Sequence, residues 1–394
     1  MNVEEYYEES LRLHAEHLGK LEIISKAPVK NIDDYSVVYM PGVAGPCLRI
    51  ARDPREARLC SIKANTVAVV SDGSDVYGLG NIGGLAALPV IEGKAVLLKE
   101  FGGVDAFPIC LDTQDENEII ETVKRIAPTF GGILLEDIAS PRSFTIEKRL
   151  NEELDIPVFH DDRHGTGVVV GAAIINAFRL LGRPLSDARA VIAGAGAAGA
   201  GIARILPHLG IRDTVVCDSK GIIGASRFSE FGEDKMELLE YTNRDGLTGG
   251  LAEAVLDRNI FIGVSKARVL TEKLLKTMAE DPVIFAMSYP EPEVLPGVVK
   301  KAGVRVICTG RQELPNRIDN TLAFPGIFRG ALDAGATDIT DLMTAAAAFA
   351  IAGEVPAAEL TEDKILPSLF EGDVAGAVAI AVADAWTEDI RKKR

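Results

Sequence analysis

Apolar and polar positions along the chain follow two periods, and their alternation predicts an α/β fold. Short apolar runs that end in polar or glycine residues predict strands at 66–73, 94–103, 106–113, 131–140 and 156–162. Between the last three runs, apolar residues recur at helical spacing over 116–130 and 144–154. Strands that alternate with helices favour βαβ units, so we expect a largely parallel sheet in this part of the chain.

The chain begins with a different pattern. Residues 3–24 carry apolar positions at helical spacing, whereas 31–46 is expected to form a loop because prolines and glycines interrupt its second half. Tyr39 lies in this loop.

The pattern restarts after a long apolar helix expected over 164–182. A strand, a glycine turn and a helix over 188–210 are followed by strand candidates at 213–218, 260–265, 282–288 and 305–309. The region 324–355 then has a helical pattern. We therefore expect an N-terminal α/β domain over 1–163 and a doubly wound, Rossmann-type domain over 164–394 that ends in a helical segment.

Composition and charge narrow the classes of function. The chain has 394 residues, 47% of them hydrophobic, with 42 basic and 58 acidic residues and a net charge of −16. Without a long basic block, nucleic acid and anionic membranes are poor partners. The longest apolar run noted, 374–386, is too short to span a membrane, and the start resembles no signal peptide. Five cysteines without CxxC spacing favour reduced thiols, so we expect a cytoplasmic protein.

A glycine motif, GAGAAG, joins the predicted strand and helix of the second domain. Its glycines allow a tight turn and a close approach of the backbone to a pyrophosphate, while Asp218 ends the next strand and can bond ribose hydroxyls. This predicts a site for NAD or NADP formed by Gly194, Ala195, Gly196, Ala197, Ala198, Gly199 and Asp218. The carboxylate slightly favours NAD, although Ser219 and Lys220 can accommodate the 2′-phosphate of NADP. The alternative is a glycine cluster that only packs helices.

Four carboxylates follow two successive predicted strands, Glu136 and Asp137 after one and Asp161 and Asp162 after the next. The carboxyl ends of parallel strands share one edge, so these acids are expected to converge in one crevice. A divalent cation would relieve their repulsion, and oxygen ligands favour Mg²⁺ or Mn²⁺. The alternatives are helix caps and solvated strand ends, or metal ligation by the neighbouring histidines, His160 and His164.

Two further polar groups are weak candidates on their own. Tyr39 lies in a loop, where most tyrosines are packed, and Lys94 begins an apolar run, where most lysines are solvated. A nearby metal ion and burial would both lower the pKa of Lys94 and make it a usable base.

The segments 39–47, 72–112, 133–138, 157–167, 191–203 and 316–334 together resemble the small-subunit malic enzymes, in that family's order. The resemblance implies that L-malate is oxidised by NAD or NADP and decarboxylated to pyruvate and CO₂. It implies a divalent metal held by Glu136, Asp137 and Asp162, with Tyr39 as general acid, Lys94 as general base and Asn320 as a substrate-binding amide. It also implies a homodimer or higher oligomer, for which the N-terminal helical segment is a reasonable contact.

Four positions near the chemistry depart from the family's pattern: Met40 stands where Thr is usual, Arg163 where Gln is, and Tyr289 and Asp319 where Asn is. Tyr289 is expected beside the substrate and the nicotinamide, where a phenol is larger than an amide. Arg163 is expected to pair with a substrate carboxylate or with Asp319. Two alternatives follow: malolactic or oxaloacetate decarboxylase activity without net redox change, and a non-catalytic regulatory protein that binds nucleotide.

Overall fold

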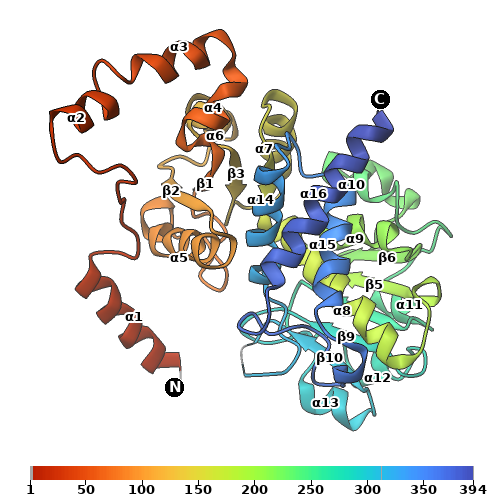
Figure 1. Cartoon of the computed structure of the whole chain (residues 1–394). Coiled ribbons are helices and arrows are strands. Elements are labelled where there is room, and N and C mark those ends of the chain that lie inside the picture. The colour runs from red at the N-terminus through yellow and green to blue at the C-terminus, as the bar shows by residue number, and fades with distance from the viewer. Residues whose placement is uncertain (1–2, 312, 394) are drawn as a thin grey trace.

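The computed structural model of the chain describes residues 3–311 and 313–393. Two sheets with helices on both faces form the body, and an arm of short N-terminal helices lies beside it (Figure 1). Both sheets are parallel except for one short edge strand, so the predicted α/β class is confirmed.

The N-terminal arm consists of α1 (Val3–His17), α2 (Ile32–Val38), α3 (Ala44–Arg52) and α4 (Ala57–Cys60). None of these helices has a buried residue. The prediction of a loop over 31–46 is wrong in part: the Asn31 side chain accepts a hydrogen bond from the Asp34 N–H at 2.8 Å and caps α2. The prolines and glycines break the helix only after Tyr39, which is its C-terminal cap.

The first sheet has the strand order β2-β1-β3-β4, and all its neighbours are parallel. Alternate residues of β1 enter different clusters: Val67 and Val69 face α5 and α8, while Ala68 and Val70 face α6 and α7. Burial on both faces explains why these strands are apolar throughout. The elements are β1 (Thr66–Ser71), α5 (Gly84–Gly102), β2 (Asp105–Cys110), α6 (Glu116–Ile126), β3 (Gly132–Leu135), α7 (Arg142–Glu153) and β4 (Val158–His160).

The predicted strand at 94–103 is wrong, because this segment is the second half of α5. The buried stripe of α5 has helical spacing, but it includes small residues that give no hydrophobic signal. Two of them are glycines that allow close packing: a Cβ at Gly84 would lie 2.3 Å from the Leu111 carbonyl oxygen, and one at Gly102 would lie 2.7 Å from that of Pro325. Lys94 therefore projects from the middle of a helix.

The second sheet has the order β10-β9-β8-β5-β6-β7, with only β7 antiparallel to its neighbour. One face packs against α8 and α9 and the other against α11, α12 and α13, as in a doubly wound fold. Its strands are β5 (Arg189–Ala193), β6 (Asp213–Asp218), β7 (Gly221–Ile222), β8 (Ile260–Gly263), β9 (Val283–Ala286) and β10 (Val306–Thr309). Its helices are α9 (Ala197–Ile205), α10 (Glu233–Leu238), α11 (Leu251–Val255), α12 (Glu272–Leu275) and α13 (Pro296–Lys301).

Helix α8 (Thr166–Leu181) lies between the two sheets, and one continuous apolar cluster runs from the first sheet through α8 to the second. The C-terminal helices α14 (Phe324–Asp333), α15 (Asp341–Gly353) and α16 (Val374–Lys393) complete this cluster, and α14 also packs on α5. The helical stretch Asp161–Leu181 has the length and composition to cross a membrane, but 72% of its most apolar window is buried in the fold. The prediction that 374–386 is the longest apolar run is therefore wrong, because Asp161–Leu181 is longer.

Candidate metal centre and nucleotide pocket

Four carboxylates meet at the carboxyl ends of β3 and β4, which are adjacent and parallel. Glu136 and Asp137 follow β3, while Asp161 and Asp162 begin a π-helical turn, Asp161–Gly165, directly after β4. The structure brings one oxygen each of Glu136, Asp137 and Asp162 within 4.8 Å of one another. Residues about 25 positions apart in sequence thus share one site.

Local backbone geometry holds these acids in place. Asp137 has a φ of +54°, in the left-handed region, and its N–H donates to Asp162 Oδ2 at 3.1 Å. In the π-helical turn, a Cβ at residue 165 would lie 2.0 Å from Asp161 Oδ1, so any residue other than glycine there would displace the Asp161 carboxylate. The turn after β4 is therefore shaped around its own carboxylate.

Lys94 reaches this cluster from α5. Its Nζ lies 2.7 Å from Asp161 Oδ2 and 2.8 Å from Glu136 Oε1, and 4.5 Å from the centroid of the Phe324 ring. The Asn320 amide donates to Asp161 Oδ2 at 3.3 Å. Lys94 and Asn320, which the sequence predicted to be site residues, therefore both lie at the carboxylate cluster.

The electrostatics of the cluster are unbalanced, since four carboxylates surround one lysine. Burial acts to lower the pKa of Lys94, but the charges of Asp161 and Glu136 outweigh it and raise that pKa. Burial and then the Asp162 charge raise the pKa of Asp137 to about 7. Burial also raises the pKa of Glu136 well above its usual value. These carboxyls therefore resist carrying their full charge without a cation.

The donor set fits a divalent cation. Glu136 Oε2 and Asp137 Oδ2 are buried and have no hydrogen-bond partner among the described residues. Buried acceptors are normally satisfied, and an ion bound by Glu136, Asp137 and Asp162 would satisfy both. Oxygen-only donors suit Mg²⁺ or Mn²⁺. In the described part of the chain, the group of ligand atoms close enough to hold one ion contains no histidine.

Arg163 does not pair as expected. It is 5% exposed, and its guanidinium contacts Glu147 of α7 at 3.2 Å and Glu237 of α10 at 3.1 Å. Asp319 instead pairs with Arg317, at 3.2 Å. Arg163 therefore ties the π-helical turn to a helix of each sheet rather than to a substrate carboxylate.

Glu147 was missed by the sequence analysis. It accepts hydrogen bonds from the His160 N–H at 2.9 Å and from Arg163, and His164 Nε2 lies 2.9 Å from its Oε1. Burial acts to raise the pKa of Glu147, but His164 and Arg163 hold it well below its usual range. No sequence signal distinguishes it, because a glutamate in a mid-helix position is typical of a solvated face. Here it holds the turn that carries two of the clustered acids.

Tyr39 lies outside the cluster. Its ring is 59% exposed and contacts Tyr35, with 6.0 Å between centroids. No hydrogen bond, ion pair or ring contact between described residues joins it to Lys94 or to the acids. Figure 1 shows α2, which Tyr39 ends, at the far side of the arm.

The glycine motif forms a tight turn between β5 and α9. Gly194 has a φ of +135°, and a Cβ there would lie 2.5 Å from the Val264 carbonyl oxygen. A Cβ at Gly199 would lie 1.9 Å from the Gly194 carbonyl oxygen, whereas one at Gly196 would meet open space. Two glycines therefore serve packing, and the third leaves room where a pyrophosphate would approach the N-terminus of α9.

A cavity of about 730 Å³ extends from this turn to the end of β6. The predicted residues that line it are Gly194, Ala195, Gly196 and Asp218, and it also includes Lys235 of α10 and Lys266, which follows β8. Sequence reasoning missed Lys235, because nothing in the sequence marks a lysine of the short helix α10 that folds back onto Asp218.

Tyr289 follows β9 but is not among the residues that line this cavity. Its ring packs against Tyr77 of the first domain, with 5.4 Å between centroids, and is 47% exposed. The two tyrosines therefore join loops that follow β1 and β9.

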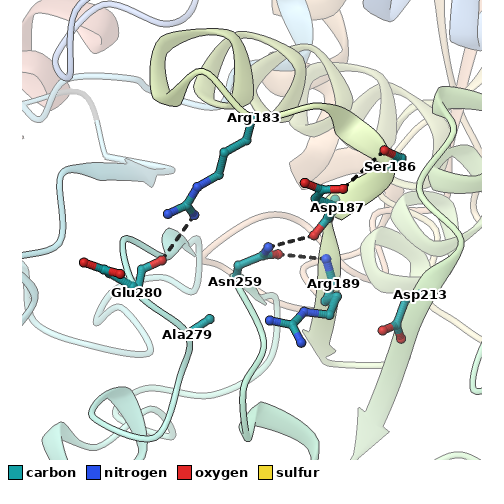
Figure 2. A pocket seen from close by; sticks show the side chains of 9 residues that line it. Arg183, Ser186, Asp187, Arg189, Asp213, Asn259, Ala279 and Glu280 are labelled. Carbon is teal, nitrogen blue, oxygen red and sulfur yellow. Dashed lines mark hydrogen bonds between the residues drawn. The ribbon is translucent and has the colours of Figure 1, made fainter.

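A second cavity, of about 610 Å³, lies at the opposite edge of the second sheet, where β5, β6 and β8 begin (Figure 2). Its polar groups bind one another: the Asn259 side chain accepts from the Arg189 N–H at 2.7 Å and donates to the Asp187 carbonyl at 2.8 Å. Ligands of open α/β sheets bind at the carboxyl ends of the strands, so this cavity is a poor candidate for the reaction.

Two family models match the chain. "Malic enzyme, N-terminal domain" matches residues 18–121, and "Malic enzyme, NAD binding domain" matches residues 164–296 and 303–387. The bifunctional malic/malolactic enzyme of Bacillus subtilis is 51% identical over 381 residues, which cover 97% of this chain and 93% of that protein. The NADP-dependent malic enzyme of Escherichia coli is 43% identical; the match covers 94% of this chain and 51% of that longer protein.

Solved structures agree with these matches. The crystal structure of malic enzyme from Pyrococcus horikoshii superposes with a TM-score of 0.90 at 44% sequence identity, and covers 96% of this chain and 91% of that one. The Rossmann-type fold predicted for the second part of the chain is confirmed by this likeness.

Metal affinity should depend on pH, because Asp137 has a pKa of about 7 and must lose its proton to bind a cation. Below pH 7, the apparent affinity for Mn²⁺ should rise at least about tenfold per pH unit and level off above it. Electron paramagnetic resonance of free Mn²⁺ measures this. Asp137→Asn should bind Mn²⁺ more weakly and should lose the part of this pH dependence that Asp137 contributes. An affinity that is flat between about pH 5 and 8 would contradict the assignment.

Arg163→Ala should lower the free energy of unfolding by about 3–5 kcal/mol, because it leaves the buried Glu147 short of a counter-charge. Arg189→Ala is the matched control. Its ion pair with Asp257 is exposed, so its loss should cost less than about 1 kcal/mol. Urea unfolding measures the free energy of unfolding of both variants. Equal losses would show that the buried ion pairs of Arg163 stabilise the fold no more than the exposed pair of Arg189.

Proposed function

The chain belongs to the malic enzyme family, and we propose that it oxidises L-malate with NAD or NADP and decarboxylates the product to pyruvate and CO₂, with Mg²⁺ or Mn²⁺ as cofactor. One observation carries the proposal: three clustered carboxylates, two of which have a buried oxygen without a hydrogen-bond partner among the described residues, lie beside Lys94 and Asn320. A glycine-turn cavity in the neighbouring sheet supports a dinucleotide as the hydride acceptor.

Each group in the cluster has a role that follows from its place. Glu136, Asp137 and Asp162 would hold the divalent ion, which when bound supplies Lewis-acid polarisation of the malate hydroxyl and of the carbonyl that replaces it. The Asn320 amide is held by Asp161 and offers hydrogen bonds that orient a carboxylate of the substrate. Glu136, Asp137 and Asp161 are buried, and the lower local dielectric constant there strengthens these interactions.

Lys94 is the proposed base. Its Nζ would accept the proton of the C2 hydroxyl as the C2 hydride moves to the nicotinamide. In the metal-free cluster, the neighbouring carboxylates hold the pKa of Lys94 above its usual value. When a cation neutralises Glu136, that attraction falls and the pKa of Lys94 falls with it. Charge compensation of the acids is therefore what makes Lys94 a base.

Tyr39 is the proposed acid, which donates a proton to C3 after the bond between C3 and C4 breaks and CO₂ leaves. We propose that Tyr39 acts in the site of a second copy within a homodimer. Two observations support this: no hydrogen bond, ion pair or ring contact between described residues joins Tyr39 to the cluster of its own chain, and the helices of the arm have no buried residue. Exposed apolar side chains on the arm, including Leu11, Val37 and Leu48, favour a protein contact.

A second candidate is malolactic activity, in which pyruvate is reduced before it leaves. The name of the Bacillus subtilis relative, a bifunctional malic/malolactic enzyme at 51% identity, favours testing it. Lactate formed from malate without free NADH would identify this reaction.

A cytoplasmic setting is also proposed. The thiols of Cys217 and Cys308 are buried and free, which suits a reducing compartment.

Lys94→Ala should reduce malate-dependent formation of NAD(P)H by about 10²- to 10⁴-fold, because a general base is lost. Lys94→Arg should not rescue it, since a guanidinium does not lose its proton near neutral pH. Lys99→Ala is the control: this lysine lies on the same helix, is exposed, and pairs with Asp105. A chelator should abolish the wild-type rate. Full activity of Lys94→Ala would overturn the assignment.

Mixing two inactive variants tests the shared site. If Tyr39 acts across a dimer, Tyr39→Phe and Lys94→Ala chains should together regain about one quarter of the wild-type rate. Half of randomly mixed dimers are hybrids, and each hybrid has one intact site. Activity that stays at the level of the separate variants would place Tyr39 in its own chain's site.

A further inference from the structure

Asp218, at the end of β6, is saturated with hydrogen-bond donors. Its Oδ1 accepts from the Lys220 N–H and from Arg227, both at 2.9 Å. Its Oδ2 accepts from Arg227 at 3.0 Å and from Lys235 at 2.7 Å. A carboxylate offers about four lone-pair positions, and all are filled here. Burial acts to raise the pKa of Asp218, but Arg227 and Lys235 hold it well below its usual range.

Because its lone pairs are all used, Asp218 has no free position for a ribose hydroxyl. In a NAD site, a carboxylate at the end of the second strand accepts hydrogen bonds from the ribose hydroxyls. Asp218 would have to release Lys235 or Arg227 to accept even one. Its negative charge is also compensated, so it does not repel a phosphate as a free carboxylate would. The sequence-based preference for NAD therefore loses its premise.

The same neighbourhood is rich in unused donors. Lys235 and Lys220 both line the nucleotide cavity. Lys235 uses one of its three N–H groups on Asp218. The Lys220 side chain is 68% exposed, and among the described residues its Nζ bonds only Glu230. The ion-paired group itself contains three cations (Lys220, Arg227 and Lys235) and two carboxylates (Asp218 and Glu230), so one positive charge of this group is not compensated within it.

We infer that the ribose end of the nucleotide cavity is a 2′-phosphate subsite, in which Lys235 and Lys220 bind the phosphate and Asp218 serves to hold Lys235 in place. The chain would then bind NADP at least as tightly as NAD. This inference rests on the proposed function only in that a pyridine nucleotide binds the cavity, and it names which nucleotide the site favours.

Arg227 and Lys235, the two side chains that bond Asp218, differ in their other contacts. Arg227 also donates to the Gly221 and Ile222 carbonyls at 3.1 Å and lies 5.2 Å from the Phe231 ring, so it is part of the local fold. Among the residues that the structure describes, the Lys235 side chain bonds only Asp218. Lys235 can therefore be removed without dismantling the end of the sheet, whereas Arg227 cannot.

The test is equilibrium binding of NAD and NADP by calorimetry, without malate, because the two nucleotides differ only in the 2′-phosphate. Lys235→Ala should weaken NADP binding by roughly tenfold or more and change NAD binding less than about threefold, since a charge-assisted bond to phosphate is lost. Asp218→Asn should leave NAD binding within about threefold, because the ribose hydroxyls do not depend on this carboxylate. Lys276→Ala removes an exposed lysine paired with Glu272 on α12 and is the charge-matched control, expected to change neither affinity.

Two results would overturn the inference. One is a wild-type protein that binds NAD roughly tenfold or more tightly than NADP. The other is an Asp218→Asn variant that loses NAD affinity by that factor while Lys235→Ala leaves NADP affinity unchanged. Both leave the malic enzyme proposal standing, because NAD still binds. Failure of either nucleotide to bind would instead count against the proposed function itself.

Discussion

The structure depends on an imbalance of charge at the carboxyl ends of β3 and β4, where Lys94 is held between Glu136 and Asp161 while Asp137 and Asp162 lie beside them. Several features far apart in sequence exist to hold this arrangement. The left-handed backbone at Asp137 and the glycine at 165 shape the two loops. Such an excess of buried negative charge is costly without a cation, so the fold and the chemistry are linked through the same residues.

Burial of the cluster also joins the two sheets. The turn that carries Asp161 and Asp162 continues into α8, and a Cβ at Gly201 of α9 would lie 1.7 Å from the Arg163 carbonyl oxygen. Arg163 pairs with Glu237 of α10, which in turn lies 3.0 Å from Arg204 of α9. The acids are thus fixed against the helix that begins at the glycine turn. The metal and nucleotide sites are thus connected through helices that pack and form ion pairs with one another.

The sequence predicted what depends on local pattern and sheet geometry. Parallel strands that end in acids placed Glu136 and Asp162 at one edge, and the glycine turn placed the nucleotide cavity. It failed where long-range contacts decide: 94–103, in the second half of α5, was predicted to be a strand because the buried stripe of this helix includes glycines and alanines, which give no hydrophobic signal. Glu147 and Lys235 have no local sequence signal, because the role of each depends on a partner in another element. That partner is the His160 N–H for Glu147 and the Asp218 carboxylate for Lys235. Asp218 was recognised as an acid, but its saturation by cations is visible only in three dimensions.

The central claim is that the carboxylates of Glu136, Asp137 and Asp162 together bind one catalytic divalent ion. Crystals grown with Mn²⁺ and measured for anomalous scattering test it most directly. The account predicts one strong peak per chain, about 2.0–2.3 Å from an oxygen of each of the three carboxylates. A peak at another place in the chain, or none while Lys94 still contacts Glu136 and Asp161, would contradict it.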